Sequence, residues 1–145
     1  FNMRNNEIQA VIGINQLKRL DTNNKLRAKN FKLFLSKLDK KKFFTDYMIE
    51  GNSNYAFPLI LKTKSFRNRD RFEKYLTKNK VEFRRGNAGG GNQMRQPYLK
   101  KIIKLKNFND FQNVEHVHHF GYYIGNFPTL THKKIIKLVN IINNY

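Results

Sequence analysis

Three arginines flank a glycine-rich segment near the middle of the chain, and the guanidinium group is well suited to holding phosphate groups. The segment runs from Gly86 to Tyr98, with Arg84 and Arg85 before it and Arg95 within it. It is not a Walker A loop, because no Gly-Lys-Ser/Thr follows, and its spacing does not match the dinucleotide-binding fingerprint. Two interpretations stay open: a loop whose glycines allow close approach to a phosphate-bearing ligand, or a flexible surface loop.

A second candidate anion site lies before the first predicted helix. Asn6 can cap this helix, and Gln9 three residues later completes a capping box. Asn2 and Arg4 therefore precede a helix N-terminus, where free N–H groups and the helix dipole favour an anion. The alternative is that Arg4 points into water.

Three histidines near the C-terminal third invite a metal-binding interpretation. On a strand, His116 and His118 would share a face, and His119 is adjacent. The only nearby carboxylates are Glu115 and Asp110, so we expect surface or hydrogen-bonded histidines and no metal site. No Ser-His-Asp spacing and no paired carboxylates are evident. The chain therefore resembles part of a ligand site, without a complete active site.

The long first helix predicted from Asn6 onwards carries apolar residues around much of its circumference. Asp21–Asn24 is expected to bend or break it, and helical spacing resumes up to Leu38. Because one neighbouring layer cannot cover so wide an apolar surface, we predict that its first half is exposed or packed on another copy. The residues concerned are Ile8, Val11, Ile12, Ile14, Leu17 and Leu20.

The remaining pattern predicts an α+β fold: the long N-terminal helix plus a small antiparallel or mixed sheet covered by helices. Pro58 cannot donate a ladder hydrogen bond, so its strand is predicted to lie at a sheet edge or to contain a local bulge. We expect a helical segment over residues 1–38 and a small α+β domain over residues 39–145. The predicted elements are strands at Tyr55–Lys62, Val81–Arg85 and Phe120–Ile124, a helix capped by Ser65 and a last helix capped by Thr131.

Composition limits the protein classes that remain. The 145 residues include 29 basic and 10 acidic ones, giving a net charge of +19. No run of about 18 apolar residues exists, which excludes a membrane span, and the lack of cysteine excludes a disulfide scaffold and a Cys-based zinc finger. The charge favours a polyanionic partner, but Asn, Lys, Ile, Phe and Tyr dominate the chain, and their A/T-rich codons offer a rival explanation. One function that the charge would support is that of a standalone basic module that binds nucleic acid, and we keep it as an alternative.

Several motifs resemble, in the right order, those of PLP-dependent sugar-nucleotide aminotransferases and dehydratases of the DegT/StrS family. Asn2-Met3-Arg4 followed by the segment from Asn6 to Leu17 resembles the family's "N-x-R-x-x-[DE]-I-Q-A-A-x-G-x-x-Q-L" stretch. The remaining matches are Ala56–Leu59 to "F-P-[IL]", Val81–Arg84 with Asn92–Tyr98 to the "I-E-T-R…N-x-x-R-Q-P-x-Y" stretch of the hexulose 3-dehydrase branch, and Phe120–Thr131 to "F-x-x-G-x-x-P-x-L-T".

This resemblance implies the C-terminal part of a fold-type I enzyme that binds pyridoxal 5'-phosphate (PLP). The large domain, with the Schiff-base Lys or the His that replaces it in some 3-dehydrases, would lie upstream of Phe1. The fragment alone is then expected to be inactive. The complete enzyme would transaminate or dehydrate a nucleotide-linked 4-keto-6-deoxy sugar in polysaccharide biosynthesis.

The resemblance also implies site residues and partners. Asn2, and with it Arg4, would reach the PLP phosphate of the neighbouring subunit, so a homodimer with a shared active site is expected. Arg84, Asn92 and Arg95 match family positions near the sugar-nucleotide phosphates. Arg85 and the Gly89–Gly91 insertion depart from the family pattern. A cytoplasmic enzyme without a membrane or nucleic-acid partner is expected, and a fragment serving only as a dimerisation surface is the third possibility.

Overall fold

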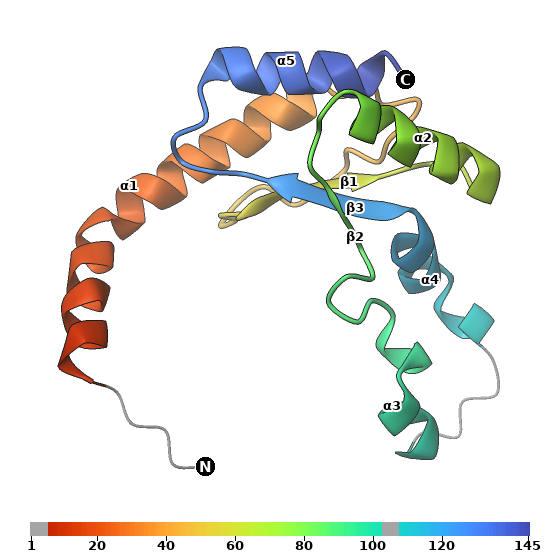
Figure 1. Ribbon diagram of the computed structural model, residues 1–145, viewed down its shortest axis with the longest axis horizontal. Helices are drawn as coiled ribbons and strands as arrows, with labels where there is room; N and C mark the ends of the chain where they lie inside the picture. The colour runs from red at the N-terminus through yellow and green to blue at the C-terminus, as the bar shows by residue number, and fades with distance from the viewer. Residues whose placement is uncertain (1–5, 103–107) are drawn as a thin grey trace.

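The structure, a computed structural model, describes residues 6–102 and 108–145. It confirms the predicted α+β class: a long N-terminal helix, a three-stranded antiparallel sheet and helices packed against it (Figure 1). The elements are α1 (Glu7–Lys37), β1 (Ala56–Ile60), α2 (Phe66–Lys78), β2 (Arg84–Arg85), the 3-10 helix η1 (Gln93–Arg95), α3 (Pro97–Ile102), the 3-10 helix η2 (Phe108–Phe111), α4 (Gln112–Phe120), β3 (Gly121–Gly125) and α5 (His132–Asn143).

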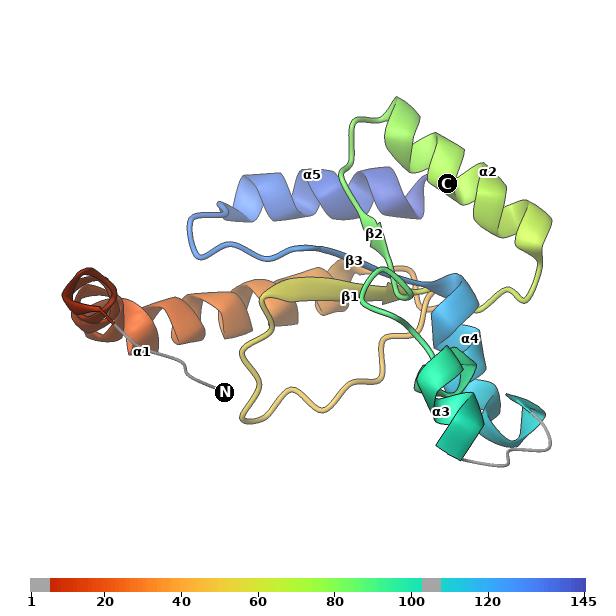
Figure 2. The same ribbon diagram turned by 60° about the horizontal axis from the view of Figure 1, so that its bottom comes forward.

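Helix α1 begins with the predicted capping box. The Asn6 side chain accepts a hydrogen bond from the Gln9 N–H at 2.9 Å, and the Gln9 side chain accepts one from the Asn6 N–H at 3.3 Å. The helix then runs without interruption to Lys37, so a break at residues 21–24 does not occur, but α1 does bend between its N-terminal part and the remainder (Figures 1 and 2). The polar side chains there do not compete with the helix: Asn24 instead accepts a hydrogen bond from Ser53 at 3.0 Å.

The sheet has the order β1-β3-β2, so β1 is an edge strand as Pro58 predicts. Pro58 lies opposite Tyr123. The Leu61 N–H donates to the Phe120 carbonyl at 3.1 Å, and hydrogen-bonded positions alternate along an antiparallel ladder. Pro58 therefore falls at a position whose nitrogen faces away from β3, and the missing N–H costs the sheet no hydrogen bond.

Strand β2 is shorter than the predicted strand over Val81–Arg85, which was wrong for its first three residues. Helix α2 ends in a C-cap in which Lys80 adopts the left-handed region, with φ of 57°. The Val81 N–H then donates to the Leu76 carbonyl at 3.0 Å. This cap directs residues 81–83 away from β3, so only Arg84 and Arg85 pair with it, opposite Tyr123 and Tyr122.

One face of the sheet forms the core, beneath α2, α5 and the C-terminal half of α1 (Figures 1 and 2). Side chains alternate between the faces of a strand, so Phe57 and Leu59 of β1 lie on this face with Tyr122 and Ile124 of β3. All four are buried, and Phe57 stacks on Phe34 of α1 with ring centroids 4.5 Å apart. The opposite face, which holds Tyr123, has no helical layer over it in Figure 1.

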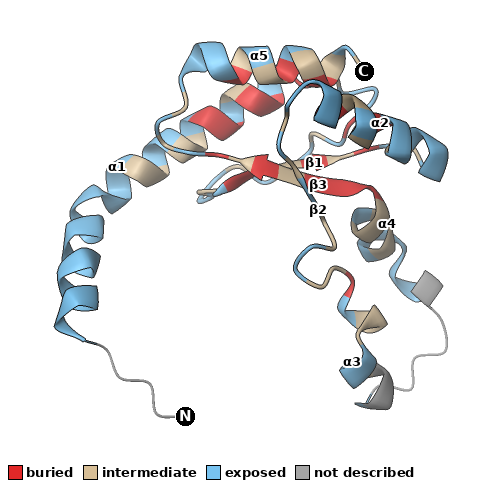
Figure 3. Ribbon diagram, viewed as in Figure 1, coloured by how far each residue is buried: buried red, intermediate tan, exposed pale blue. Residues whose placement is uncertain are grey.

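The N-terminal half of α1 projects beyond the core and is exposed (Figure 3). The predicted exposure of its apolar residues is confirmed, since their exposed fractions lie between 45% and 72%. We call this surface the α1 apolar face; it consists of Ile8, Val11, Ile12, Ile14, Leu17 and Leu20.

A buried asparagine just after β3 joins α1 to the segment before β1. The Asn126 side chain donates to the carbonyls of Arg27 and Asn54, at 3.0 and 2.9 Å. Its carbonyl oxygen accepts from Asn30 of α1 at 3.2 Å, and its N–H donates to Tyr55 at 2.8 Å. Asn126 is 1% exposed, so no water replaces these partners.

We expect Asn126→Ala to lower the free energy of unfolding by about 3 kcal/mol, because it leaves two carbonyls and the Asn30 amide buried without their partner. Urea denaturation of the purified chain measures this. Asn140→Ala, an exposed position on α5, is the control and should change stability by less than about 0.5 kcal/mol. Equal stabilities of the two variants would contradict the role of Asn126.

Candidate functional site

The glycine-rich segment is held against α4 by one carboxylate. Glu115 accepts hydrogen bonds from the Arg95 Nε at 3.0 and 2.9 Å on its two oxygens and forms an ion pair with the same guanidinium. It also accepts from the Asn92 side chain at 2.8 Å, and the His119 Nε2 lies 3.0 Å from it. The structure thus brings together Asn92 and Arg95, two of the predicted substrate-binding residues.

Asn92 is 1% exposed, and its remaining polar groups bond to η1 and to α4. Its side-chain oxygen caps η1 by accepting the Met94 N–H at 3.0 Å, and its own N–H donates to the His118 Nδ1 at 3.0 Å. The buried amide of Asn92 therefore shapes the loop, and a ligand contact from it would require these bonds to change.

The charges in this cluster are shifted accordingly. The hydrogen bond from Arg95 is the largest cause that lowers the pKa of Glu115 to about 2, with Asn92 and His119 adding to it. Burial, followed by the charges of His119 and Arg95, lowers the pKa of His118 below its ordinary value. A neutral His118 agrees with its role as acceptor of the Asn92 N–H.

The three histidines lie on helix α4, so the strand considered in the sequence analysis is wrong for this segment. Besides the contacts of His118 and His119, the His116 Nε2 lies 2.7 Å from the Leu61 carbonyl. All three therefore have protein partners. Within residues 6–102 and 108–145, no group of three His, Cys, Asp or Glu side chains is arranged to hold a metal ion.

Gly91 approaches a protein side chain at close range. It has φ of +62°, and a Cβ at this position would lie 2.2 Å from the His118 Nδ1. A left-handed conformation and the absence of a side chain are both needed for the Asn92 N–H to reach His118. The loop is thus a docked segment at this glycine, whereas a Cβ at Gly89 would meet nothing within 4 Å.

The three arginines differ in their partners. Arg85 shares the core face with Tyr122, and it binds Glu73 with both Nε and Nη2, at 2.9 and 2.6 Å. Arg84 lies opposite Tyr123 and so faces the uncovered side of the sheet. Its side chain is exposed and forms no hydrogen bond or ion pair with the described part of the chain. Arg84 is therefore the arginine available to an external anion.

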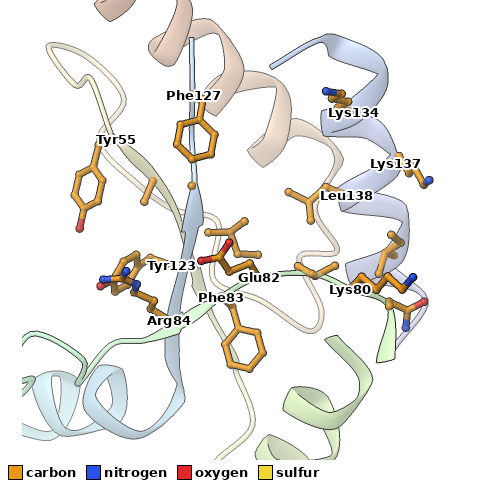
Figure 4. A pocket seen from close by; sticks show the side chains of 16 residues that line it. Tyr55, Lys80, Glu82, Phe83, Arg84, Tyr123, Phe127, Lys134, Lys137 and Leu138 are labelled. Atoms are coloured by element: carbon orange, nitrogen blue, oxygen red, sulfur yellow. The ribbon is translucent and has the colours of Figure 1, made fainter. Parts of the chain in front are cut away.

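Arg84 also lines a cleft of about 750 Å³ between β3, the segment after α2, and α5 (Figure 4). We call it the α5 cleft. Its volume lies within the range of about 300–1,000 Å³ that is usual for small-molecule sites. No sequence motif predicted this cleft. The signal was present in the spacing of Lys134, Lys137, Leu138 and Ile141, which share one face of α5, but the opposing wall is formed by residues distant in sequence.

Asn2 and Arg4, the predicted cofactor-binding residues, lie outside the described residues. Their role stays a prediction. In the part of the chain that the structure describes, no helix is both long and apolar enough to cross a membrane.

The sequence is similar to that of known proteins over nearly its whole length. The model of the DegT/DnrJ/EryC1/StrS aminotransferase family matches residues 1–143. The GDP-4-keto-6-deoxy-D-mannose 3-dehydratase of Yersinia pseudotuberculosis is 27% identical over 143 residues, which are 98% of this chain and 36% of that protein. The lipopolysaccharide biosynthesis protein RfbH of Salmonella typhimurium is 27% identical over 135 residues, 90% of this chain and 30% of that protein.

The fold is similar to that of solved structures as well. The E. coli GDP-4-keto-6-deoxy-D-mannose-3-dehydratase with bound hydrated PLP is 26% identical and superimposes with a TM-score of 0.82. The match covers 98% of this chain and 36% of the dehydratase. The chain thus spans about a third of the length of these relatives.

We expect Gly91→Ala to destabilise the docked loop by about 2 kcal/mol, because it adds left-handed backbone strain and a clash with His118. Hydrogen exchange at the Asn92 N–H and urea denaturation measure the effect. Gly89→Ala is the matched control and should change stability by less than about 0.5 kcal/mol. Equally fast exchange of Asn92 in both variants would show that the loop is not docked through Gly91.

The low pKa of Glu115 predicts a pH-dependent contribution to stability. A carboxyl whose pKa is lowered by folding, here from 4.5 to about 2, stabilises the folded state fully above about pH 5. This contribution is lost as the pH falls through about 2. Glu115→Gln should therefore be less stable than the parent at pH 7, and the difference in melting temperature should shrink between about pH 5 and 2.

Asp110→Asn is the control for this pH dependence, since Asp110 is exposed and forms no ion pair with residues 6–102 or 108–145. A constant difference between the parent and Glu115→Gln across this pH range would assign the effect to the change of shape and not to the charge.

Proposed function

Because the chain belongs to the DegT/DnrJ/EryC1/StrS aminotransferase family, we propose that it is the C-terminal part of a PLP-dependent enzyme acting on nucleotide-linked 4-keto-6-deoxy sugars. The similar 3-dehydratases favour dehydration at C3 over transamination. We place the complete protein in the cytoplasm and in polysaccharide biosynthesis. Since the family match spans nearly the whole chain, a standalone nucleic-acid-binding module is not needed to account for it.

The single observation that carries this proposal is the match of almost the whole chain to about a third of an enzyme that binds PLP. In an enzyme of this type, bound PLP acts as an electron sink, which stabilises the negative charge that develops when a bond of the sugar is cleaved. Every lysine side chain that the structure describes is exposed, and none is enclosed as a covalent anchor for PLP would be. The described residues therefore fit a contribution to the substrate side, and we assign the anchor to the remainder of the protein.

The α1 apolar face suggests that residues 1–38 and residues 39–145 have different roles. Residues 39–145 and the C-terminal half of α1 share one core, whereas the N-terminal half of α1 has none. Large apolar side chains exposed around much of a helix usually mark a contact with another polypeptide. We propose that residues 1–38 bridge to the cofactor-binding domain and that the complete enzyme is a homodimer, in which Asn2 and Arg4 reach the PLP phosphate of the neighbouring subunit.

Among the predicted substrate residues, Arg84 has the strongest support as a ligand of the sugar-nucleotide diphosphate. It carries a permanent charge, lies on the uncovered side of the sheet and has no partner among the described residues. Arg95 and Asn92 are already bonded to Glu115. We propose that they hold the loop beside Arg84, and that a direct contact from them to substrate is a secondary role.

A chimera tests the function. This chain replaces the matching 36% of the Yersinia 3-dehydratase. We expect the chimera to bind PLP and to consume GDP-4-keto-6-deoxymannose, and the isolated chain with added PLP to be inactive. Turnover by the isolated chain, or a folded chimera that retains PLP without any turnover, would contradict the proposal.

In the active chimera, Arg84→Ala should raise KM for the sugar nucleotide by roughly tenfold and leave PLP bound, because a charge-assisted hydrogen bond to phosphate is lost. Steady-state kinetics and the PLP absorbance spectrum measure the two effects. Arg67→Ala, an exposed arginine on α2, is the control. Loss of PLP in Arg84→Ala with an unchanged KM would place Arg84 at the cofactor instead.

The α1 apolar face gives opposite expectations in the two contexts. Ile12→Asn removes an apolar side chain that is 56% exposed, so it should leave the stability of the isolated chain nearly unchanged and reduce its self-association. In the chimera the same change should lower the melting temperature by several degrees, because Ile12 becomes buried. Analytical ultracentrifugation and thermal unfolding measure both, with Lys18→Asn as the control. Equal effects in the two contexts would refute the bridging role.

A further inference from the structure

The α5 cleft is electrostatically one-sided. Four of its lining residues are cations, and Glu82 is its only carboxylate. None of these cations has a hydrogen bond from its side chain or an ion pair with the described part of the chain. Like charges gathered around one space repel each other, and an anion in that space relieves the repulsion. The four cations are Lys80, Arg84, Lys134 and Lys137.

Helix α5 and the C-cap of α2 determine where the lysines of the cleft lie. Lys134 and Lys137 are three residues apart on α5 and therefore share the face that also carries Leu138. The C-cap of α2 places Lys80 near this face of α5 (Figure 4), at a left-handed position where glycine is normally preferred. Figure 4 shows Lys80 and Lys137 on the same side of the cleft, across from Tyr123 and Arg84.

The floor of the cleft offers an unused backbone donor. The Gly86 N–H donates to the Gly121 carbonyl, and donor positions recur every second residue along β3. The polar groups of Gly125 therefore point to the side where Glu82 would pair with them if β2 were longer. Because residues 81–83 leave the sheet, no described backbone group pairs with Gly125 on that side.

Aromatic rings stand at the mouth of the cleft. Phe127 is 59% exposed and Tyr55 is 70% exposed, although both line the cleft. An exposed ring next to unpaired cations provides a stacking surface for a flat aromatic ligand that carries negative charge. A nucleoside diphosphate combines these two properties.

We propose that the α5 cleft binds the nucleoside diphosphate part of a nucleotide ligand. Lys80, Lys134 and Lys137 surround the phosphates, and the ring of Phe127 stacks on the base. The choice of a nucleotide rests on the proposed function, whereas the charge and volume of the cleft do not. The cleft then extends the site of Arg84 with three cations that the family resemblance did not supply.

Calorimetric titration of the purified 145-residue chain tests this proposal with three probes: GDP, pyrophosphate and guanosine. We expect saturable binding of GDP that is tighter than that of pyrophosphate or guanosine. Lys137→Ala should weaken GDP binding about two- to fivefold, the range of an exposed charge pair. Lys133→Ala, an exposed lysine on the same helix but outside the cleft, should leave it unchanged.

The role of the aromatic ring has its own variant. Phe127→Ala should make the affinity for GDP equal to that for pyrophosphate. Because Phe127 is exposed, this change is not expected to unfold the chain. Equal affinity of the parent chain for GDP and pyrophosphate would overturn the stacking on Phe127. Equal weakening by Lys133→Ala and Lys137→Ala, or displacement of GDP by a random oligonucleotide with a steep salt dependence, would overturn the cleft in favour of a diffuse basic surface.

These titrations need neither cofactor nor turnover, so their failure is separable from that of the proposed function. An active chimera together with an isolated chain that binds no GDP would overturn the cleft alone. An inactive chimera together with GDP binding that depends on Lys137 would overturn the function alone.

Discussion

The turn that leads from β3 into α5 depends on one buried asparagine, Asn126. Asn126 satisfies carbonyls of α1 and of the segment before β1, and α1 returns a bond through Asn30. Asn30 also donates to the Phe127 carbonyl at 3.1 Å, which sets the turn that leads into α5. Because these polar groups are buried, each needs its partner, and the turn has little freedom. The rim of the α5 cleft and the lysines of α5 are thereby placed relative to the sheet.

The molecule is closed on one side of its sheet and open on the other. The closed side is a self-contained core of aromatic and aliphatic side chains from α1, α2, α5 and the strands β1 and β3. The open side carries Tyr123 and Arg84, and the α1 apolar face projects beyond it. This asymmetry agrees with a chain that covers about a third of its relatives: the closed side stabilises the fold by itself, and the open side presents the groups that need a further partner.

Ion pairs with carboxylates decide which arginines of this basic chain remain available to a ligand. Arg85 and Arg95 are each held by a carboxylate, and those bonds join β2 to α2 and the glycine-rich loop to α4. Arg84, one residue from Arg85, has no such partner among residues 6–102 and 108–145, because neighbouring residues of a strand face opposite sides of the sheet. A net charge of +19 therefore says little about which cation meets a ligand. The register of β2 against β3 decides that Arg84, and not Arg85, faces the open side of the sheet.

Local signals in the sequence determined the elements that depend on neighbouring residues. The caps at Asn6, Ser65 and Thr131, the edge position of Pro58 and the unpartnered apolar residues of α1 were all predictable, since each follows from residues within a few positions. The motifs likewise pointed to the family. Tertiary structure alone decided the shortened β2, the helix that holds the three histidines, the capture of Arg95 and Asn92 by Glu115, and the α5 cleft. The capture of Arg95 and Asn92 and the α5 cleft depend on contacts between residues 20 or more positions apart, and such contacts form only when the whole core closes.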